Sequence, residues 1–312
     1  MRKFLSAVML LALARCTPVQ GLNAITPTGG LTITKNIAYA PGNRHTLDIY
    51  RPKDAHGLPV IVFFYGGSWR EGSKQIYPFV AATLARRGNI VIVPDYRLYP
   101  EVQFPAFLRD CAQAVGWTQQ HLASLGGDPT RVFLMGHSAG AYNAVMLGLD
   151  PHYLAEAGVD RARIAGIIGL AGPYDFLPIT GADIKPVFAP VNDGPESQPI
   201  TYVDGDNPPL LLLAGEADHV VKPKNTHALA AKVRQLGGSA ETRFYPGISH
   251  VQLVLAIAPA FQWLAPVLRD VQAFIDTHSL APASNTTQPP SGHASNHVPH
   301  EPATLTMDEL PG

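Results

Sequence analysis

Residues 132–142 read VFLMGHSAGAY, and this stretch decides the fold that the rest of the chain can adopt. An apolar run ends at Gly136, and a serine then stands between small residues before a segment of helical composition begins. A G-x-S-x-G sequence between a strand and a helix presents its serine on a sharp turn above the sheet edge. The helix N-terminus beside it favours nearby negative charge. We therefore interpret Ser138 as a nucleophile; the alternative is a strand-to-helix turn without chemistry.

Apolar segments alternate with helical patterns on both sides of this stretch. The strand candidates are LTITKNIAYA, HTLDIYRP, PVIVFFYGG, NIVIVPDYRL, RVFLMGHS, IAGIIGLAG, PPLLLLAGEAD and ETRFYPGISH. The middle candidates are almost continuously apolar, as in strands buried on both faces of a parallel sheet, whereas the first two alternate and are expected to be antiparallel edge strands. Residues 104–127 and 226–238 carry helical patterns. We predict an α/β fold with a mainly parallel central sheet of about eight strands flanked by helices.

Composition indicates which class of molecule the chain binds. The chain has 312 residues, 46% of them hydrophobic, which is enough for one large domain or two small ones. Lys and Arg number 23 against 24 Asp and Glu, and no long basic run occurs. A nucleic-acid partner is therefore not expected, and a neutral small molecule fits better.

Both ends of the chain differ in character from the segment between them. Residues 1–21 begin with two cations and an apolar run over 4–14, which predicts an export signal and a secreted or periplasmic protein. A lipoprotein anchored at Cys16 and a retained N-terminal helix are the alternatives, and a membrane partner is expected only with the anchor. Residues 281–312 are rich in Pro, Ser, Thr, Asn and His, so we predict a disordered tail after a catalytic domain at 30–280.

Cysteine and histidine usage predicts neither a disulfide framework nor a metal site. The chain has two cysteines, Cys16 at the expected processing site and Cys111 inside a helical pattern. The tail histidines, His293, His297 and His300, lack a cysteine or acidic cluster that would complete a metal site, so we expect them to be solvated.

Two downstream residues could activate the serine. A serine hydroxyl reacts readily when a base takes its proton and a third group orients that base. Asp218 and His250 each follow a predicted strand, and the order Ser138, Asp218, His250 is the nucleophile, acid, histidine order of the α/β-hydrolase arrangement. Glu216 is the alternative acid. His219 is the alternative base, although it lies too close to Asp218 in sequence to face it across a site.

The stretch FFYGGSW at residues 63–69 offers a place for an oxyanion. Its paired glycines allow backbone N–H groups to turn toward the serine, and we expect Gly67, Ser68 and Ala139 to supply the donors. A plain glycine turn is the alternative. His137, next to the nucleophile, is expected to be structural.

Together, YGGSW, VPDYRL, GGDPTRVFLMGHSAG, GEADHVV and GISH resemble the α/β-hydrolase esterases. The resemblance covers roughly residues 40–280 and lies near the carboxylesterase, hormone-sensitive-lipase-like, feruloyl-esterase and arylformamidase-like branches. In those relatives a histidine usually precedes the glycines, whereas Tyr65 stands here. The PDYRL segment resembles one that braces the oxyanion loop, so Asp95 and Arg97 are expected to be structural.

The resemblance implies a serine esterase that acts on small or aryl-containing esters through an acyl-enzyme, without a metal or organic cofactor. An aryl amidase, formamidase or exopeptidase on the same triad is one alternative. A non-catalytic binding protein of the same fold is another. Residues 173–205 form a Pro-rich insertion, and its aromatics Tyr174, Phe176 and Phe188 either line an acyl pocket or pack the loop.

Overall fold

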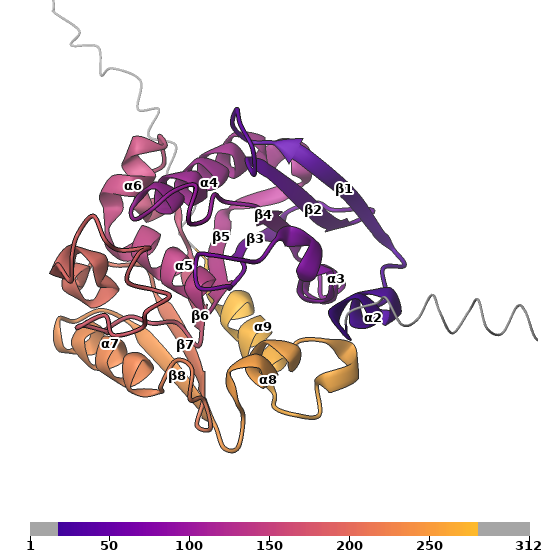
Figure 1. Ribbon diagram of the computed structural model, residues 1–312. Coiled ribbons are helices and arrows are strands. Elements are labelled where there is room, and N and C mark those ends of the chain that lie inside the picture. The colour runs from indigo at the N-terminus through magenta and orange to yellow at the C-terminus, as the bar shows by residue number, and fades with distance from the viewer. Residues whose placement is uncertain (1–17, 280–312) are drawn as a thin grey trace, which may run out of the picture. The chain divides into compact units, whose positions relative to one another are not determined.

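A computed structural model describes residues 18–279, and all eight strand candidates form strands of one sheet within this range (Figure 1). The sheet order is β1-β2-β4-β3-β5-β6-β7-β8. The strands are β1 (Leu31–Ala38), β2 (Thr46–Pro52), β3 (Leu58–Phe64), β4 (Ile90–Pro94), β5 (Gly127–His137), β6 (Gly166–Leu170), β7 (Leu210–Gly215) and β8 (Ala240–Tyr245). Strands β4, β3 and β5 to β8 pair in parallel, which confirms the predicted α/β sheet.

The first two strands pair antiparallel as predicted, but β2 is not an edge strand. It lies between β1 and β4, with Tyr50 opposite Val91 and Leu47 opposite Pro94. The alternation in its sequence comes from Asp48, whose side chain is buried and ion-paired with Lys74 Nζ at 2.7 Å. Asp48, the polar residue that indicated a solvent-exposed face, therefore belongs to a buried ion pair.

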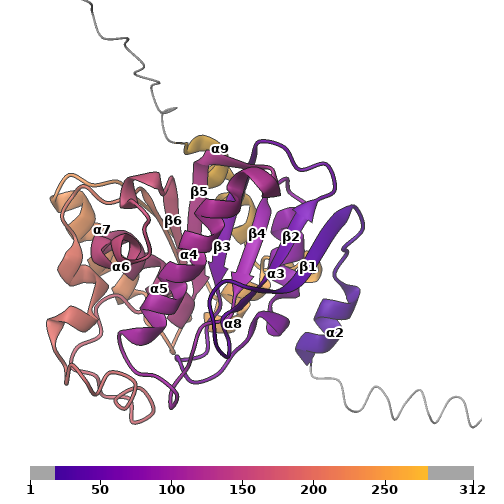
Figure 2. The same ribbon diagram turned by 90° about the horizontal axis from the view of Figure 1, so that it is seen from above.

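Helices cover both faces of the sheet. In Figures 1 and 2, α4 and α5 lie on one face and α3 and α9 on the other. The helices are α2 (Pro18–Ile25), α3 (Pro78–Ala85), α4 (Ala106–Leu125), α5 (Ala139–Leu149), α6 (Pro151–Glu156), α7 (Lys224–Gln235), α8 (His250–Leu255) and α9 (Val267–Thr277). Between residues 18 and 279, no helix is long and apolar enough to cross a membrane.

Helix α2 begins inside the segment predicted to be a leader. Leu22 is buried, and the Asn23 side chain accepts a hydrogen bond from the Phe79 backbone N–H at 3.0 Å. The Asn23 amide also donates to the carbonyl of Ile76 at 3.1 Å. Residues 18–25 thus pack against the start of α3. The rest of the predicted leader, residues 1–17 with Cys16, and the predicted tail lie outside the described residues.

The segment 173–205 contains no α-helix or strand. It runs through turns and two short 3-10 helices, η3 (Pro195–Ser197) and η4 (Pro199–Tyr202). The Asn225 side chain of α7 accepts hydrogen bonds from the backbone N–H groups of Tyr174 and Asp175, both at 2.9 Å. The start of this irregular segment is therefore held by the helix that follows β7.

Helix α5 approaches the sheet by direct backbone contact. A Cβ atom on Gly140 would lie 2.0 Å from the Phe64 carbonyl oxygen, and one on Gly136 would lie 2.1 Å from the Gly140 carbonyl oxygen. No side chain fits at either position, because real Cβ atoms do not approach other atoms so closely. The two glycines of the G-x-S-x-G sequence therefore fix α5 against β3 and β5.

Candidate active site

Ser138 occupies the turn between β5 and α5 in a sparsely populated backbone conformation. Its φ is 56° and its ψ is −121°, a geometry that costs a non-glycine residue about 1–3 kcal/mol. The Ser138 N–H donates to the Leu170 carbonyl of the neighbouring strand β6 at 2.8 Å, which helps to hold the turn. The side chain lines a cavity of about 580 Å³. The strained turn thus presents the hydroxyl group at a cavity rather than in the core.

Asp218 and His250 meet at the carboxyl edge of the sheet. Asp218 follows β7, and His250 is the first residue of α8 after β8. The Asp218 Oδ2 atom lies 2.7 Å from His250 Nδ1. The other carboxylate oxygen accepts the backbone N–H groups of Val220 and Val221, both at 2.8 Å. Because an ionised carboxylate only accepts hydrogen bonds, His250 carries its proton on Nδ1, and Nε2 is left free to act as a base.

Electrostatics keep Asp218 ionised. Burial raises the pKa of its carboxyl group, but the hydrogen bonds from His250, Val221 and Val220 and the His250 charge outweigh this effect. The pKa therefore lies below the ordinary value of 3.8. Glu216 and His219, the alternative acid and base, have exposed side chains, and within residues 18–279 neither forms a hydrogen bond to His250.

His137 supports the backbone of His250. The two rings lie 4.8 Å apart, and His137 Nε2 is 3.2 Å from the His250 carbonyl oxygen. Burial and the neighbouring His250 charge lower the pKa of His137 to about 3, so its ring is neutral at physiological pH. The neutral ring donates from Nε2 to the His250 carbonyl and so helps to position that backbone. This contact is consistent with the structural role expected for His137.

The FFYGGSW stretch turns beside Ser138. Gly67, Ser68 and Trp69 have φ values of 133°, 53° and 56° in succession. A Cβ atom on Gly67 would lie 2.1 Å from the Glu71 carbonyl oxygen, so the turn requires glycine there. Ser68 and Ala139 line the cavity together with Ser138, whereas Gly67 does not. The structure thus brings two of the three expected donors to the cavity that holds the serine.

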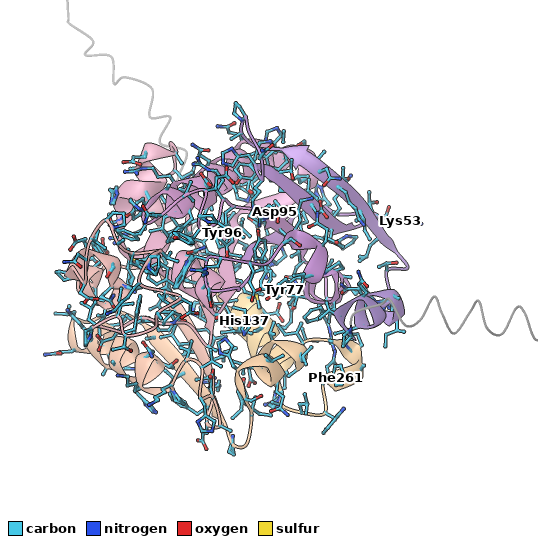
Figure 3. All side chains as sticks on the ribbon, in the orientation of Figure 1. Lys53, Tyr77, Asp95, Tyr96, His137 and Phe261 are labelled. Atoms are coloured by element: carbon cyan, nitrogen blue, oxygen red, sulfur yellow. The ribbon has the colours of Figure 1, made fainter. Side chains whose placement is uncertain are left out.

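Tyr65 stands where the esterases that the sequence resembles usually have histidine, and it ties the turn to the PDYRL segment. Its hydroxyl donates to Asp95 Oδ1 at 2.8 Å, and the Lys74 backbone N–H donates to the same oxygen at 2.8 Å. Tyr96 donates to the Tyr65 carbonyl at 2.7 Å, and the two rings stack at 4.8 Å. Figure 3 shows Asp95 and Tyr96 close together. The tyrosine therefore serves as a buried brace.

Arg44 and Arg97 complete this brace. Of the two, only Arg97 was assigned a structural role from the sequence. Arg44 donates to the Gly72 carbonyl at 2.8 Å and to the Tyr65 hydroxyl at 2.7 Å. Arg97 forms a bidentate pair with buried Asp110, at 2.9 and 2.7 Å. The structural role expected for Arg97 agrees with this pairing. Arg44 lies in no recognisable sequence motif, and its role depends on partners in distant segments.

Trp69 is held by a residue that sequence reasoning missed. Its indole N–H donates to Asn143 Oδ1 at 2.9 Å, and Asn143 is fully buried on α5. The Trp69 ring meets Tyr142 and Phe188 edge-on, at 5.0 and 4.9 Å between centroids. The available signal was a lone amide in the otherwise apolar helix sequence AGAYNAVMLGL.

The aromatic residues of the 173–205 segment have different positions. Phe176 lines the cavity, whereas Tyr174 and Phe188 are buried. The Tyr174 hydroxyl lies against Gly169 of β6, where a Cβ atom would come within 2.1 Å of it. Phe176 therefore faces the cavity, whereas the other two rings pack the segment. Other cavity walls come from Leu177, Ile179, Ile184 and Val221.

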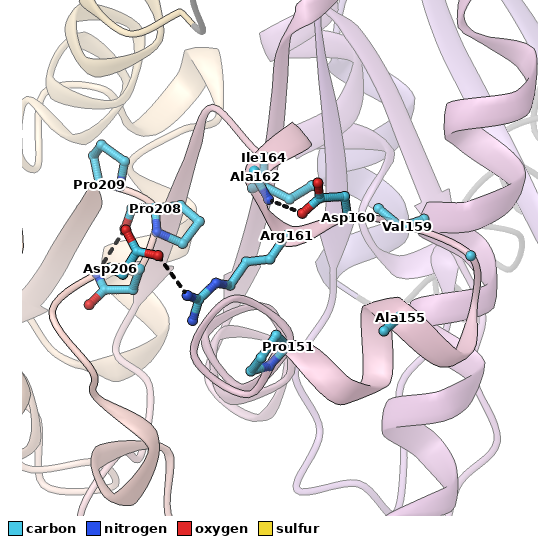
Figure 4. A pocket seen from close by; sticks show the side chains of 12 residues that line it. Pro151, Ala155, Val159, Asp160, Arg161, Ala162, Ile164, Asp206, Pro208 and Pro209 are labelled. Atoms are coloured by element: carbon cyan, nitrogen blue, oxygen red, sulfur yellow. Dashed lines mark hydrogen bonds and ion pairs between the residues drawn. The ribbon is translucent and has the colours of Figure 1, made fainter.

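A second hollow, of about 740 Å³, lies at the amino ends of β6 and β7. Figure 4 shows it lined by prolines and small residues, with Arg161 paired with Asp206. Active groups of open parallel sheets lie at the carboxyl ends of the strands, so this hollow lies at the opposite sheet edge from Ser138.

Among residues 18–279, no three His, Cys, Asp or Glu side chains cluster in a way that could hold a metal ion.

Comparison with known proteins places this geometry in context. The BD-FAE family model matches residues 47–233. A probable isoprenylcysteine alpha-carbonyl methylesterase of Arabidopsis thaliana is 28% identical over 247 residues, covering 72% of this chain and 52% of the relative. Esterase LipQ of Mycobacterium tuberculosis is 30% identical over 229 residues, covering 66% and 54%. The chain thus spans about half the length of these curated relatives.

Solved structures share the fold. A truncated carbohydrate esterase from gut microbiota superposes with a TM-score of 0.68 at 21% identity, covering 80% of this chain and 98% of the other. Esterase B from Lactobacillus rhamnosis gives a TM-score of 0.67 at 20% identity, covering 87% and 94%. At this level of identity the likeness establishes the α/β-hydrolase fold.

Proposed function

Because the chain belongs to the BD-FAE family, whose model spans more than half of its length, we propose that it is a serine esterase. It cleaves carboxylic esters of small or aryl-containing substrates through an acyl-enzyme. The observation that carries the proposal is the 2.7 Å contact between Asp218 and His250 at the sheet edge where the strained turn presents Ser138. The esterase relatives support the same chemistry.

The reaction proceeds in two halves. Ser138 Oγ attacks the ester carbonyl carbon while His250 Nε2 takes the hydroxyl proton, and the carbonyl electrons move onto oxygen. Backbone N–H groups of Ser68 and Ala139, two residues that line the cavity with Ser138, stabilise that oxyanion. The intermediate collapses, the C–O bond to the alcohol breaks, and His250 returns the proton to the leaving oxygen. Water then attacks the acyl-enzyme with His250 again as the base, and the acid leaves.

Asp218 acts through His250 in this scheme. Its carboxylate holds the Nδ1–H tautomer and stabilises the imidazolium that forms when Nε2 accepts the serine proton. The two backbone N–H groups on its other oxygen fix the carboxylate plane. The lowered pKa keeps this partner ionised throughout the neutral range.

The proposal is tested with a serine-reactive fluorophosphonate and a hydrolysis panel. Purified protein should be labelled covalently and should hydrolyse esters, and Ser138→Ala should fold with an unchanged melting temperature yet lose both activities. Short-chain, long-chain and feruloyl esters are compared with aryl amides, formamides and short peptides. Preference for an amide or a peptide terminus would establish the amidase or exopeptidase alternative, and absence of labelling would favour a non-catalytic binding protein.

For localisation, we propose that the N-terminal segment directs export and that cleavage occurs before α2. Support comes from the buried Leu22 and from the Asn23 hydrogen bonds, since removal of residues 18–25 would expose the surface that they cover. Cleavage after Ala14 or lipidation at Cys16 would leave this helix in place. N-terminal sequencing of the exported protein tests the proposal, and a mature chain that starts after Ile25 would contradict it.

A further inference from the structure

The cavity beside Ser138 carries positive charge that the reaction scheme does not use. Lys222 and Lys224 line it, and both side chains are exposed. Neither ammonium forms an ion pair or a side-chain hydrogen bond with any residue in the described range 18–279. The acidic side chain that lines the cavity is Asp183, whose backbone carbonyl accepts a hydrogen bond from Arg70 at 2.9 Å and which forms no ion pair with either lysine.

Helix stability does not explain these two lysines. Helix α7 begins at Lys224, has no acidic residue in its first turn and has no side-chain cap. The N-terminus of a helix carries partial positive charge, so cations there are unfavourable. Lys222, Lys224 and the helix terminus therefore concentrate positive potential at one side of the cavity mouth.

The remaining lining is largely apolar. Trp69, Phe176, Leu177 and Ile184 provide a surface for the body of a substrate, while the lysines stand at its side. Resting on the esterase function above, we propose that the preferred esters carry an anionic group, such as a carboxylate, on the part held in this cavity. The anion pairs with Lys222 and Lys224, and the uncharged body packs on the apolar wall.

Two matched pairs of esters test the proposal. Mono-4-nitrophenyl adipate and 4-nitrophenyl hexanoate differ in a carboxylate on the acyl side, whereas 4-acetoxybenzoate and 4-acetoxybenzamide differ on the alcohol side. For at least one pair, the anionic ester should have the higher kcat/KM, by roughly 3- to 20-fold at low ionic strength, as expected for two partly exposed charge pairs. Spontaneous hydrolysis is subtracted with the Ser138→Ala protein.

Substitutions identify the source of the preference. The double variant Lys222→Gln/Lys224→Gln should lose it, chiefly through a higher KM for the anionic ester of the pair. Lys232→Gln, on α7 away from the cavity, is the matched control and should retain it. Salt at about 0.5 M should reduce the preference in the wild type.

A wild-type ratio of kcat/KM, anionic to neutral ester, of one or less in both pairs would overturn the proposal, and so would a ratio that the double variant retains. Absence of any Ser138-dependent hydrolysis would instead contradict the esterase function.

A second inference concerns Asn143. The left-handed turn at Gly67, Ser68 and Trp69 belongs to the loop after β3, whereas Asn143 belongs to the helix that begins after Ser138. The 2.9 Å bond from the Trp69 indole to the Asn143 oxygen therefore joins the oxyanion turn to the nucleophile helix. The amide nitrogen of Asn143 donates to the Cys111 sulfur at 3.5 Å, and this contact fixes the orientation of the amide. We infer that Asn143 is a positioning residue that keeps the backbone donors in register with the serine.

A double-mutant cycle tests this inference. Trp69→Phe removes the N–H donor and leaves a smaller aromatic ring, and Asn143→Leu removes the acceptor. Each variant should lower kcat by roughly tenfold, with little change in KM for Asn143→Leu, which does not line the cavity, and the kcat of the combined variant should fall no further, because one bond is lost in all three. Thr118→Val, which removes another fully buried side-chain hydrogen bond on α4, is the control and should change only the melting temperature. Unchanged kcat in the two single variants, or losses that multiply, would overturn the inference.

Discussion

Replacement of Asp218 by asparagine separates the chemistry of this residue from its structural role. In the wild type, one carboxylate oxygen accepts two backbone N–H groups and the other faces His250 Nδ1 at 2.7 Å. The asparagine oxygen will keep the two backbone donors, because the amide nitrogen cannot accept from them. The amide N–H₂ then faces Nδ1, so His250 must carry its proton on Nε2 and can no longer accept the proton of Ser138.

The magnitude follows from this tautomer change. The same substitution in serine-protease triads lowers kcat by about 10⁴, and we expect a loss of about 10³–10⁴ here, or about 4–5.5 kcal/mol in activation free energy. The melting temperature should fall only slightly, since both backbone hydrogen bonds to residue 218 persist. KM should change little because Asp218 does not line the cavity.

The assay compares steady-state hydrolysis of 4-nitrophenyl butyrate with thermal unfolding. Glu216→Gln is the matched control, since its side chain is exposed two residues away and should leave kcat within about twofold. A kcat for Asp218→Asn within tenfold of the wild type would refute the assignment of the acid. An equal loss in Glu216→Gln would transfer the role to that residue.

Three further outcomes are expected. The folded-state pKa of His137, about 3 against an ordinary 6.5, makes protonation unfavourable in the folded protein, so stability is complete above pH 6.5 and declines on acidification. Urea unfolding should show a loss of about 2 kcal/mol between pH 7 and pH 5 that His137→Gln lacks. Gly140→Ala should cost about 1–3 kcal/mol and slow fluorophosphonate labelling, whereas Gly29→Ala, with open space around it, should do neither. A chain that ends at Leu280 should keep its melting temperature and turnover, whereas one that ends at Pro266 loses the buried residues of α9 and should unfold at a much lower temperature.

Sequence patterns were sufficient where a local rule determines the structure. The eight strands follow from runs of apolar residues, and the position of Ser138 follows from the steric demand for small neighbours in a tight turn. Asp218 and His250 could be named because parallel strands bring their carboxyl ends to one edge. Each of these inferences needs only a few consecutive residues and the order of the elements.

Interactions between distant segments could not be predicted in the same way. The burial of Asp48 depends on Lys74, and the Trp69 bond depends on Asn143, 74 residues away. A polar residue in an alternating strand has the same sequence signature whether it faces water or a buried cation. The separation of Phe176 from Tyr174 likewise depends on how an irregular segment packs, for which no periodicity exists.

The glycine contacts between α5 and the strands beneath it limit how such a protein can diversify. Because backbone meets backbone at Gly136 and Gly140, the serine cannot be moved by exchanging a side chain under its helix. The cavity walls, in contrast, come from the irregular segment that starts at residue 173 and from the loop after β7, where side chains can be exchanged without disturbing a strand. New substrate preferences are therefore expected to arise at the cavity-lining positions of these two segments, while Ser138, His250 and Asp218, which itself belongs to the loop after β7, stay unchanged at the sheet edge.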